Sequence, residues 1–87
     1  MAANIFQKAI TLTADWQKLA GTALVLNATL QAAADNYGPV SVRINDDNAG
    51  VAEWFAGATV GLQGVDLSMI EVKGNPGDRF LVVGNTR

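Results

Sequence analysis

The stretch Val65–Gly84 constrains the fold more than any other part of the sequence. It contains two short apolar runs separated by Gly-Asn-Pro-Gly-Asp at residues 74–78. The proline fixes φ near the value needed at the second position of a β-turn, and the glycine after it can adopt the positive φ needed at the third. In residues 69–73 and 80–83 the side chains alternate between two faces. Period-two alternation around a Gly/Pro turn predicts a β-hairpin.

The remainder of the chain repeats this alternation in short segments bounded by turn-forming residues. Strands are predicted over residues 6–13, 24–32, 40–44, 51–55 and 59–63. Residues 35–39 predict a turn, residues 45–50 a polar loop, and Gly61 and Gly64 bends or close backbone approach. Residues 15–21 suit a helical turn, a bent connector or a small extra strand. The sequence therefore predicts an all-β fold, a small antiparallel β-sandwich or jelly-roll-like barrel of seven to eight short strands.

The length of 87 residues predicts a single domain over residues 1–87, in which residues 1–6 can form an N-terminal arm. A domain of this size buries only about 60% of the surface of its unfolded chain, so its stability is marginal. The chain has no cysteine and no histidine, which excludes disulfides and the common zinc sites as sources of stability. Oligomerisation, or docking on a larger body, is the remaining route.

The net charge is small, which limits the classes of partner that the protein is expected to bind. Six Lys/Arg against eight Asp/Glu give a net charge of −2, and the basic residues are scattered, so we expect no nucleic-acid partner. No stretch approaches the roughly 20 apolar residues that cross a bilayer, and the N-terminus lacks the features of a signal peptide, so we expect no membrane association and a cytosolic site of synthesis. Charged residues make up 16% of the chain, against about 25% in ordinary domains. Either a partner covers part of the surface, or the surface is neutral and rich in Thr, Asn and Gln.

The residues that usually carry chemistry are absent or better explained as structural. Histidine and cysteine, the commonest general base and thiol nucleophile, do not occur. Most of the carboxylates lie in expected turns, where Asp hydrogen-bonds nearby backbone, so we expect no enzyme, although a carboxylate pair could serve a glycosidase. Residues 45–48 (Asn-Asp-Asp-Asn) could hold calcium, but they lack EF-hand spacing, and a solvated hairpin loop is the simpler interpretation. We therefore predict no cofactor and no metal.

The large apolar side chains outnumber the positions on one inner face. Trp54 and Phe55 are adjacent in a predicted strand and should point to opposite faces, unless a bulge turns both inward. Leu81 and Val83 make the last strand apolar on both faces, as expected of a central strand or of one covered by a partner. These observations predict an interface that also uses Trp16 and the N-terminal residues; the full set is Ile5, Phe6, Trp16, Trp54, Phe55, Leu81 and Val83.

The order of segments resembles a known group of proteins. An Ile-Thr-Leu-Thr strand at 10–13, Leu-Val-Leu-Asn-Ala at 24–28, and the segments Asn36–Val42 and Leu67–Asp78 are similar to the small β-sandwich virion proteins of tailed bacteriophages. These are capsid decoration (cement) proteins, head fibres or spike modules. Residues 45–48 depart from the pattern, because small Gly or Ser residues are expected there.

The resemblance implies a virion structural protein and supplies no functional residue. The expected role is a capsid decoration protein, a homotrimer that stabilises the head by non-covalent contacts with the major capsid protein. It would lie on the capsid surface of the virion, after assembly in the host cytoplasm. The alternative is a fibre, spike or baseplate module that binds a host glycan or protein, for which exposed aromatic rings would form the binding platform.

Overall fold

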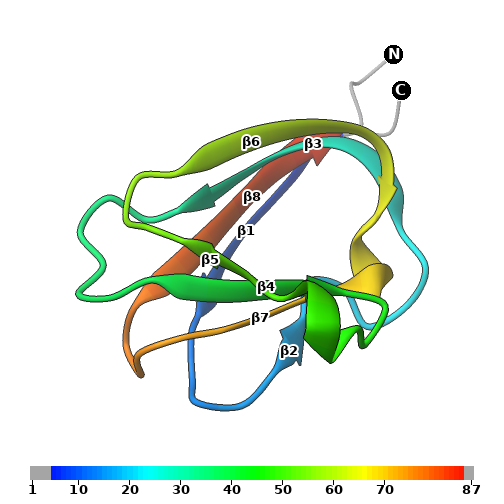
Figure 1. The fold of residues 1–87 in the computed structure, drawn as a ribbon. Helices are drawn as coiled ribbons and strands as arrows, with labels where there is room; N and C mark the ends of the chain where they lie inside the picture. The colour runs from blue at the N-terminus through cyan, green and yellow to red at the C-terminus, as the bar shows by residue number, and fades with distance from the viewer. Residues whose placement is uncertain (1–4, 86–87) are drawn as a thin grey trace.

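The protein folds into two antiparallel β-sheets packed face to face, and the predicted all-β sandwich is confirmed (Figure 1). The structure is a computed structural model that describes residues 5–85. Sheet A has the strand order β1-β8-β3-β6, and sheet B the order β2-β7-β4-β5. The strands of sheet A are β1 (Ile5–Thr11), β8 (Arg79–Asn85), β3 (Val25–Ala32) and β6 (Thr59–Asp66). Those of sheet B are β2 (Gln17–Lys18), β7 (Ile70–Lys73), β4 (Val40–Ile44) and β5 (Ala52–Trp54), with short 3₁₀ helices η1 (Asn48–Gly50) and η2 (Leu67–Met69).

The core lies between the two sheets and is built from alternate residues of each strand. Successive side chains of a strand point to opposite faces. Every second residue of β3 and β8 therefore faces sheet B, and every second residue of β4 and β7 faces sheet A. The most deeply buried large side chains include Phe80, Leu26, Leu30, Val40, Ile70, Val72 and Val82. The ring of Trp54 packs at the margin of this core, with its centroid 5.5 Å from that of Phe80.

The hairpin predicted around residues 74–78 is wrong, although its turn exists. Gly77 has φ +95° and the Asp78 N–H donates to the Asn75 carbonyl, as expected of the predicted turn. However, β7 pairs with β4 and β2 in sheet B, whereas β8 pairs with β1 and β3 in sheet A. The turn carries the chain from one sheet to the other, and its backbone bonds to Leu12 and Thr13 instead. The apolar sides of the two strands thus face each other across the core, about 10 Å apart, rather than lying side by side.

The other strands lie close to their predicted positions. The strand predicted at 40–44 has the predicted bounds, and those at 24–32 and 59–63 correspond to β3 and β6. Residues 15–21 contain the small extra strand, β2, of the alternatives considered. Of the proposed N-terminal arm, residues 1–4 lie outside the described residues, while Ile5 and Phe6 belong to β1 and pair with β8.

β6 contains a bulge at one of the predicted glycines. Leu26 of β3 is opposite Val65, but Ala28 is opposite Leu62, so β6 has one residue more than β3 over this interval. Gly64 has φ +62°, a conformation that glycine adopts without penalty, and its N–H donates to the side-chain oxygen of Asn27 at 2.9 Å. The bulge bends β6 at the end of sheet A that carries the site described below.

Two buried or half-buried carboxylates hold loops in place. The Asp78 carboxylate accepts the backbone N–H groups of Tyr37 and Gly38, at 3.0–3.1 Å. The Asp66 carboxylate accepts the N–H of Leu24 and both the N–H and the hydroxyl of Ser68, and so caps η2. These donors, the Leu24 N–H first, hold the pKa of Asp66 below its ordinary value.

Candidate functional site

The outer face of sheet A is uncharged except at the ends of two of its strands. Residues directly opposite in antiparallel strands share a face, so Gln7, Val83, Thr29 and Gly61 form one row across all four strands. The neighbouring rows follow the same rule. The face contains Ile5, Gln7, Ala9, Thr11, Val25, Asn27, Thr29, Gln31, Thr59, Gly61, Gln63, Leu81, Val83 and Asn85. None of these residues is charged; the charged residues of the face are Arg79, opposite Thr11, and Asp66, opposite Val25, each at the end of its strand.

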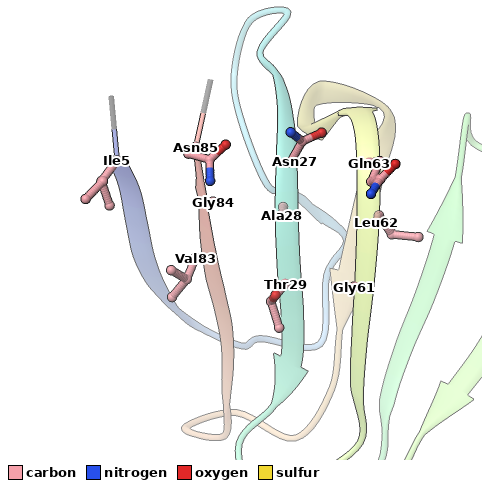
Figure 2. Close-up of a pocket in the computed structure, with 10 residues that line it drawn as sticks. All are labelled: Ile5, Asn27, Ala28, Thr29, Gly61, Leu62, Gln63, Val83, Gly84 and Asn85. Carbon is pink, nitrogen blue, oxygen red and sulfur yellow. The ribbon is translucent and has the colours of Figure 1, made fainter. Parts of the chain in front are cut away.

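A shallow groove of about 560 Å³ lies at one end of this face (Figure 2). Its lining includes the apolar side chains of Ile5 and Val83 and the amide side chains of Asn27, Gln63 and Asn85. In Figure 2 the three amides gather near the end of the sheet where β1 begins and β8 ends. No lining residue is titratable, so the groove offers hydrogen bonds and apolar contact without acid–base chemistry.

The groove lies where β8 and β3 approach closely. A Cβ built on Gly84 would lie 2.6 Å from the Asn27 carbonyl oxygen and 3.2 Å from the Ala28 Cα. Gly61, across the groove, has no heavy atom within 4 Å of such a Cβ. Of these two lining glycines, only Gly84 is required by the packing of the strands.

The outer face of sheet B has the opposite character. The Arg43 guanidinium donates from Nε to the Glu71 carboxylate at 2.7 Å and also contacts Asp46 and Asn48. Its Cζ lies 4.2 Å from the centroid of the Trp16 ring. The charged and polar groups around Arg43 therefore satisfy one another on this face.

The structure brings together three of the seven predicted interface residues. Ile5, Leu81 and Val83 lie on the outer face of sheet A; Ile5 is 70% exposed, Val83 is 49% exposed and Leu81 is half-buried. β8 is a central strand, one of the two explanations given for its two apolar faces. A central position covers the edges of β8 but not its outer face, so Val83 remains exposed.

The other four predicted residues lie elsewhere. Phe6 and Trp54 are half-buried and pack against the core. Phe55 is 71% exposed, so the adjacent rings do have opposite environments, but Phe55 lies beyond the end of β5 and outside this face. Trp16 is half-buried beneath cations, since the Lys73 Nζ also lies 4.8 Å from its ring centroid.

The amide and hydroxyl residues of the groove were missed by reasoning from the sequence. Asn27, Thr29, Gln63 and Asn85 come from three strands that are far apart in the chain. The available signal was the lack of charge at every second position of three separate predicted strands. Tyr37, 95% exposed in the loop after β3, was also absent from the predicted set.

Two of the carboxylates make structural contacts. Glu71 pairs with Arg43, while Asp47 caps η1 through the Ala49 N–H. Within residues 5–85, no three acidic side chains converge where they could hold a metal ion. The same part of the chain contains no helix of the length and apolar character needed to span a membrane.

Comparison of the chain with protein-family models, with curated proteins and with solved structures gave no match. Nothing in these comparisons links it to phage virion proteins, so that resemblance stays a prediction. The outer face of sheet A and its groove are the features from which a function can be argued.

Proposed function

We propose that the protein is a virion structural protein of a tailed phage, a capsid decoration protein that buries the outer face of sheet A against other protein subunits. The observation that carries the proposal is the combination of exposed Ile5 and Val83 with a four-stranded face whose charged residues, Arg79 and Asp66, lie only at strand ends. Burying the uncharged part of this face loses little on desolvation, because no ion there has to leave water. The proposed role is structural rather than enzymatic.

The energy available from this face suits a contact repeated many times on a lattice. Burying an exposed apolar side chain of this size contributes about 1–2 kcal/mol, and the amides around the groove can hydrogen-bond to a partner. One face thus gives a weak contact. Many copies of the protein would nevertheless stabilise the assembled shell by mass action, provided that they bind the shell and not the free capsid subunits. The major capsid protein is the proposed partner, and a homotrimer on the capsid surface is the form that the resemblance implies.

The first test is the copy number of the protein in purified phage particles. Hundreds of copies per particle, measured by quantitative mass spectrometry, are expected for a decoration protein. A handful of copies would place it in the tail or a spike and would contradict the proposal.

The second test asks whether the outer face of sheet A makes the contact. Val83→Glu introduces a charge into the face, while Val51→Glu changes the same residue type at a similarly exposed position between η1 and β5. In a co-sedimentation assay with undecorated heads, we expect Val83→Glu to abolish binding and Val51→Glu to retain it. Equal binding by both variants, with circular dichroism showing both to be folded, would contradict the proposal.

A fibre, spike or baseplate module that binds a host glycan is the second candidate. The groove favours it, because three amide side chains around an uncharged depression suit a ligand rich in hydroxyl groups. No aromatic ring lines the groove, so sugar stacking would have no platform there. Calorimetry against a glycan panel tests this candidate: any binding should be lost in Asn27→Ala and Gln63→Ala, and binding that survives both would place the ligand elsewhere.

A further inference from the structure

The side chain of Tyr37, in the loop after β3, is the most exposed large apolar side chain among residues 5–85. It is 95% exposed, and the next, that of Phe55, is 71% exposed. Within the described residues Tyr37 forms hydrogen bonds only through its backbone N–H, so its phenolic hydroxyl is not used in the fold. A tyrosine in this position offers another molecule a large apolar ring and one hydroxyl group.

The loop that carries the Tyr37 ring is firmly held. The Asp78 carboxylate accepts the N–H groups of Tyr37 and Gly38 at 3.0–3.1 Å. The Asn36 side chain accepts the Arg79 N–H at 2.8 Å and donates to the Arg79 carbonyl at 2.9 Å. A ring on a backbone that is already fixed loses little further conformational entropy on binding, which suits it to a binding surface.

The groove on the outer face of sheet A carries the groups that suit a tyrosine ring (Figure 2). Ile5 and Val83 offer apolar contact, and Gly61 leaves the backbone of β6 open, since no heavy atom lies within 4 Å of a Cβ built there. The Asn27 side chain accepts a backbone N–H of β6 with its oxygen, which leaves its own amide N–H groups for a ligand. Gln63 contributes a second amide, and amides can donate to or accept from a phenolic hydroxyl. The volume of about 560 Å³ lies in the usual range of ligand sites, about 300–1,000 Å³.

The Tyr37 ring and the groove lie at opposite ends of sheet A. Tyr37 is bonded to Asp78, the residue before β8 begins, whereas Asn85, the last residue of β8, lines the groove. The seven residues of β8 place these two ends about 20 Å apart, at about 3.3 Å per residue. Figure 1 likewise shows the loop after β3 at the end of the sandwich opposite to the beginning of β1. The ring therefore cannot reach the groove of its own chain, but it can reach that of another copy.

We infer that the Tyr37 ring of one copy inserts into the groove of a neighbouring copy. The ring would lie over the open backbone at Gly61 and against Val83, with its hydroxyl beside the amides of Asn27 and Gln63. Neither side of this contact is charged, so no ion has to leave water when it forms. The chain thus supplies both the ligand and the site, at separate places on its surface.

A contact between two unlike surfaces also constrains the assembly. Such contacts close into a cyclic assembly when the rotation between copies allows it, and a cycle of three would be the homotrimer proposed above. Two copies can also satisfy both contacts reciprocally. The inference rests on the proposal that protein subunits cover the outer face of sheet A, and it names a copy of this chain as the subunit at the groove. The end of the face near Thr11 then remains for the capsid protein.

The test separates the ring from the groove in variants of the full chain. Tyr37→Ala removes the ring and keeps the groove, whereas Gly61→Trp fills the groove and keeps the ring. An unobstructed Cβ position at Gly61 lets the sheet accept the larger side chain. Two controls make the same chemical changes elsewhere: Phe55→Ala removes another exposed ring, and Thr11→Trp adds an indole to the same face outside the groove. Sedimentation equilibrium over a range of concentrations measures association, and circular dichroism verifies the fold.

The decisive result is the behaviour of a mixture. The parent chain should self-associate, and Tyr37→Ala and Gly61→Trp should each weaken association at least about tenfold, as expected for a central aromatic contact. An equimolar mixture of these two variants should form a one-to-one dimer, because one supplies an intact groove and the other an intact ring. Phe55→Ala and Thr11→Trp should associate like the parent. A parent that stays monomeric, a mixture without the dimer, or a control that loses association to the same extent would overturn the inference.

Co-sedimentation with undecorated heads reports the capsid contact separately. Tyr37 lies outside the outer face of sheet A, so Tyr37→Ala removes the contact between copies without changing that face. Head binding by a parent chain that does not self-associate would overturn the inference and leave the proposed function standing. Self-association that follows the pattern above, without head binding, would leave the inference standing and contradict the role as a decoration protein.

Discussion

Replacing Gly84 with alanine tests the close approach of β8 to β3 beneath the groove. The new Cβ would lie 2.6 Å from the Asn27 carbonyl oxygen and 3.2 Å from both Cα and Cβ of Ala28. Real Cβ atoms almost never come within 3.0 Å of another heavy atom. The obstructing atoms include backbone of a strand paired on both sides, so no side chain can simply rotate away. We expect unfolding free energy to fall by about 1–3 kcal/mol, as for other overpacked sites.

Gly61→Ala is the matched control in the same sheet. A Cβ at Gly61 meets no heavy atom within 4 Å, and no positive φ is recorded there. At such a position alanine mainly restricts the unfolded chain and stabilises the protein by up to about 1 kcal/mol. The two variants make the same chemical change, so their difference isolates the steric term.

Urea unfolding followed by tryptophan fluorescence measures both effects. All samples must be at one protein concentration, because any self-association stabilises the folded state by mass action. We expect midpoints on opposite sides of the parent value, or a parent-like midpoint for Gly61→Ala, with a clearly lower midpoint for Gly84→Ala. Unfolding free energies for the two variants within about 0.5 kcal/mol of each other would refute the assigned spacing of β3 and β8, since surface changes of no consequence fall in that range.

Three further outcomes are expected. Asp78→Ala should lower the unfolding free energy by about 2–4 kcal/mol, measured by urea unfolding, because two backbone N–H groups of the loop after β3 lose a charged acceptor. Glu71→Gln should lower the unfolding free energy by about 1–3 kcal/mol in the same assay, because it removes the largely buried ion pair with Arg43, whereas Glu53→Gln at an exposed site should change it by less than about 0.5 kcal/mol. The lowered pKa of Asp66 means that its stabilising contribution is present above the unfolded-state pKa and is lost as pH falls through the folded-state pKa. Thermal melts from pH 6 to pH 2 should therefore show a smaller acid-induced loss in Asp66→Asn than in the parent, and identical pH profiles would contradict this.

The strands could be predicted because buried and exposed residues alternate within each strand. In β3, every second residue from Leu26 to Ala32 is buried, and this alternation is visible within a few residues of sequence. Strand partners are not encoded so locally. Ile70 and Phe80 alternate with their neighbours in the same way whether their strands pair side by side or face each other across a core. The turn at 74–78 was correctly predicted, and the hairpin was wrong, because a turn fixes a change of direction and not the sheet that the chain enters next.

The candidate site was predictable only in its apolar part. Leu81 and Val83 were identified because a strand with two apolar faces leaves one for the surface. The packing of Trp16 against Arg43 could not be predicted, because Arg43 is distant in the chain and no local sequence pattern indicates a cation over the ring. The amides of the groove, such as Asn27, became a site only when the register placed their strands together.

The position of β8 within sheet A affects how the protein can be made. A ribosome produces β1 and β3 well before Arg79–Asn85, yet these two strands meet only through β8, which lies between them. Every connection among the described strands except that from β4 to β5 also changes sheets, so few partners are neighbours in the chain. Such distant pairings form slowly. Among the described strands β1 pairs only with β8, so its backbone has no strand partner, and sheet A stays incomplete, until translation has passed Asn85.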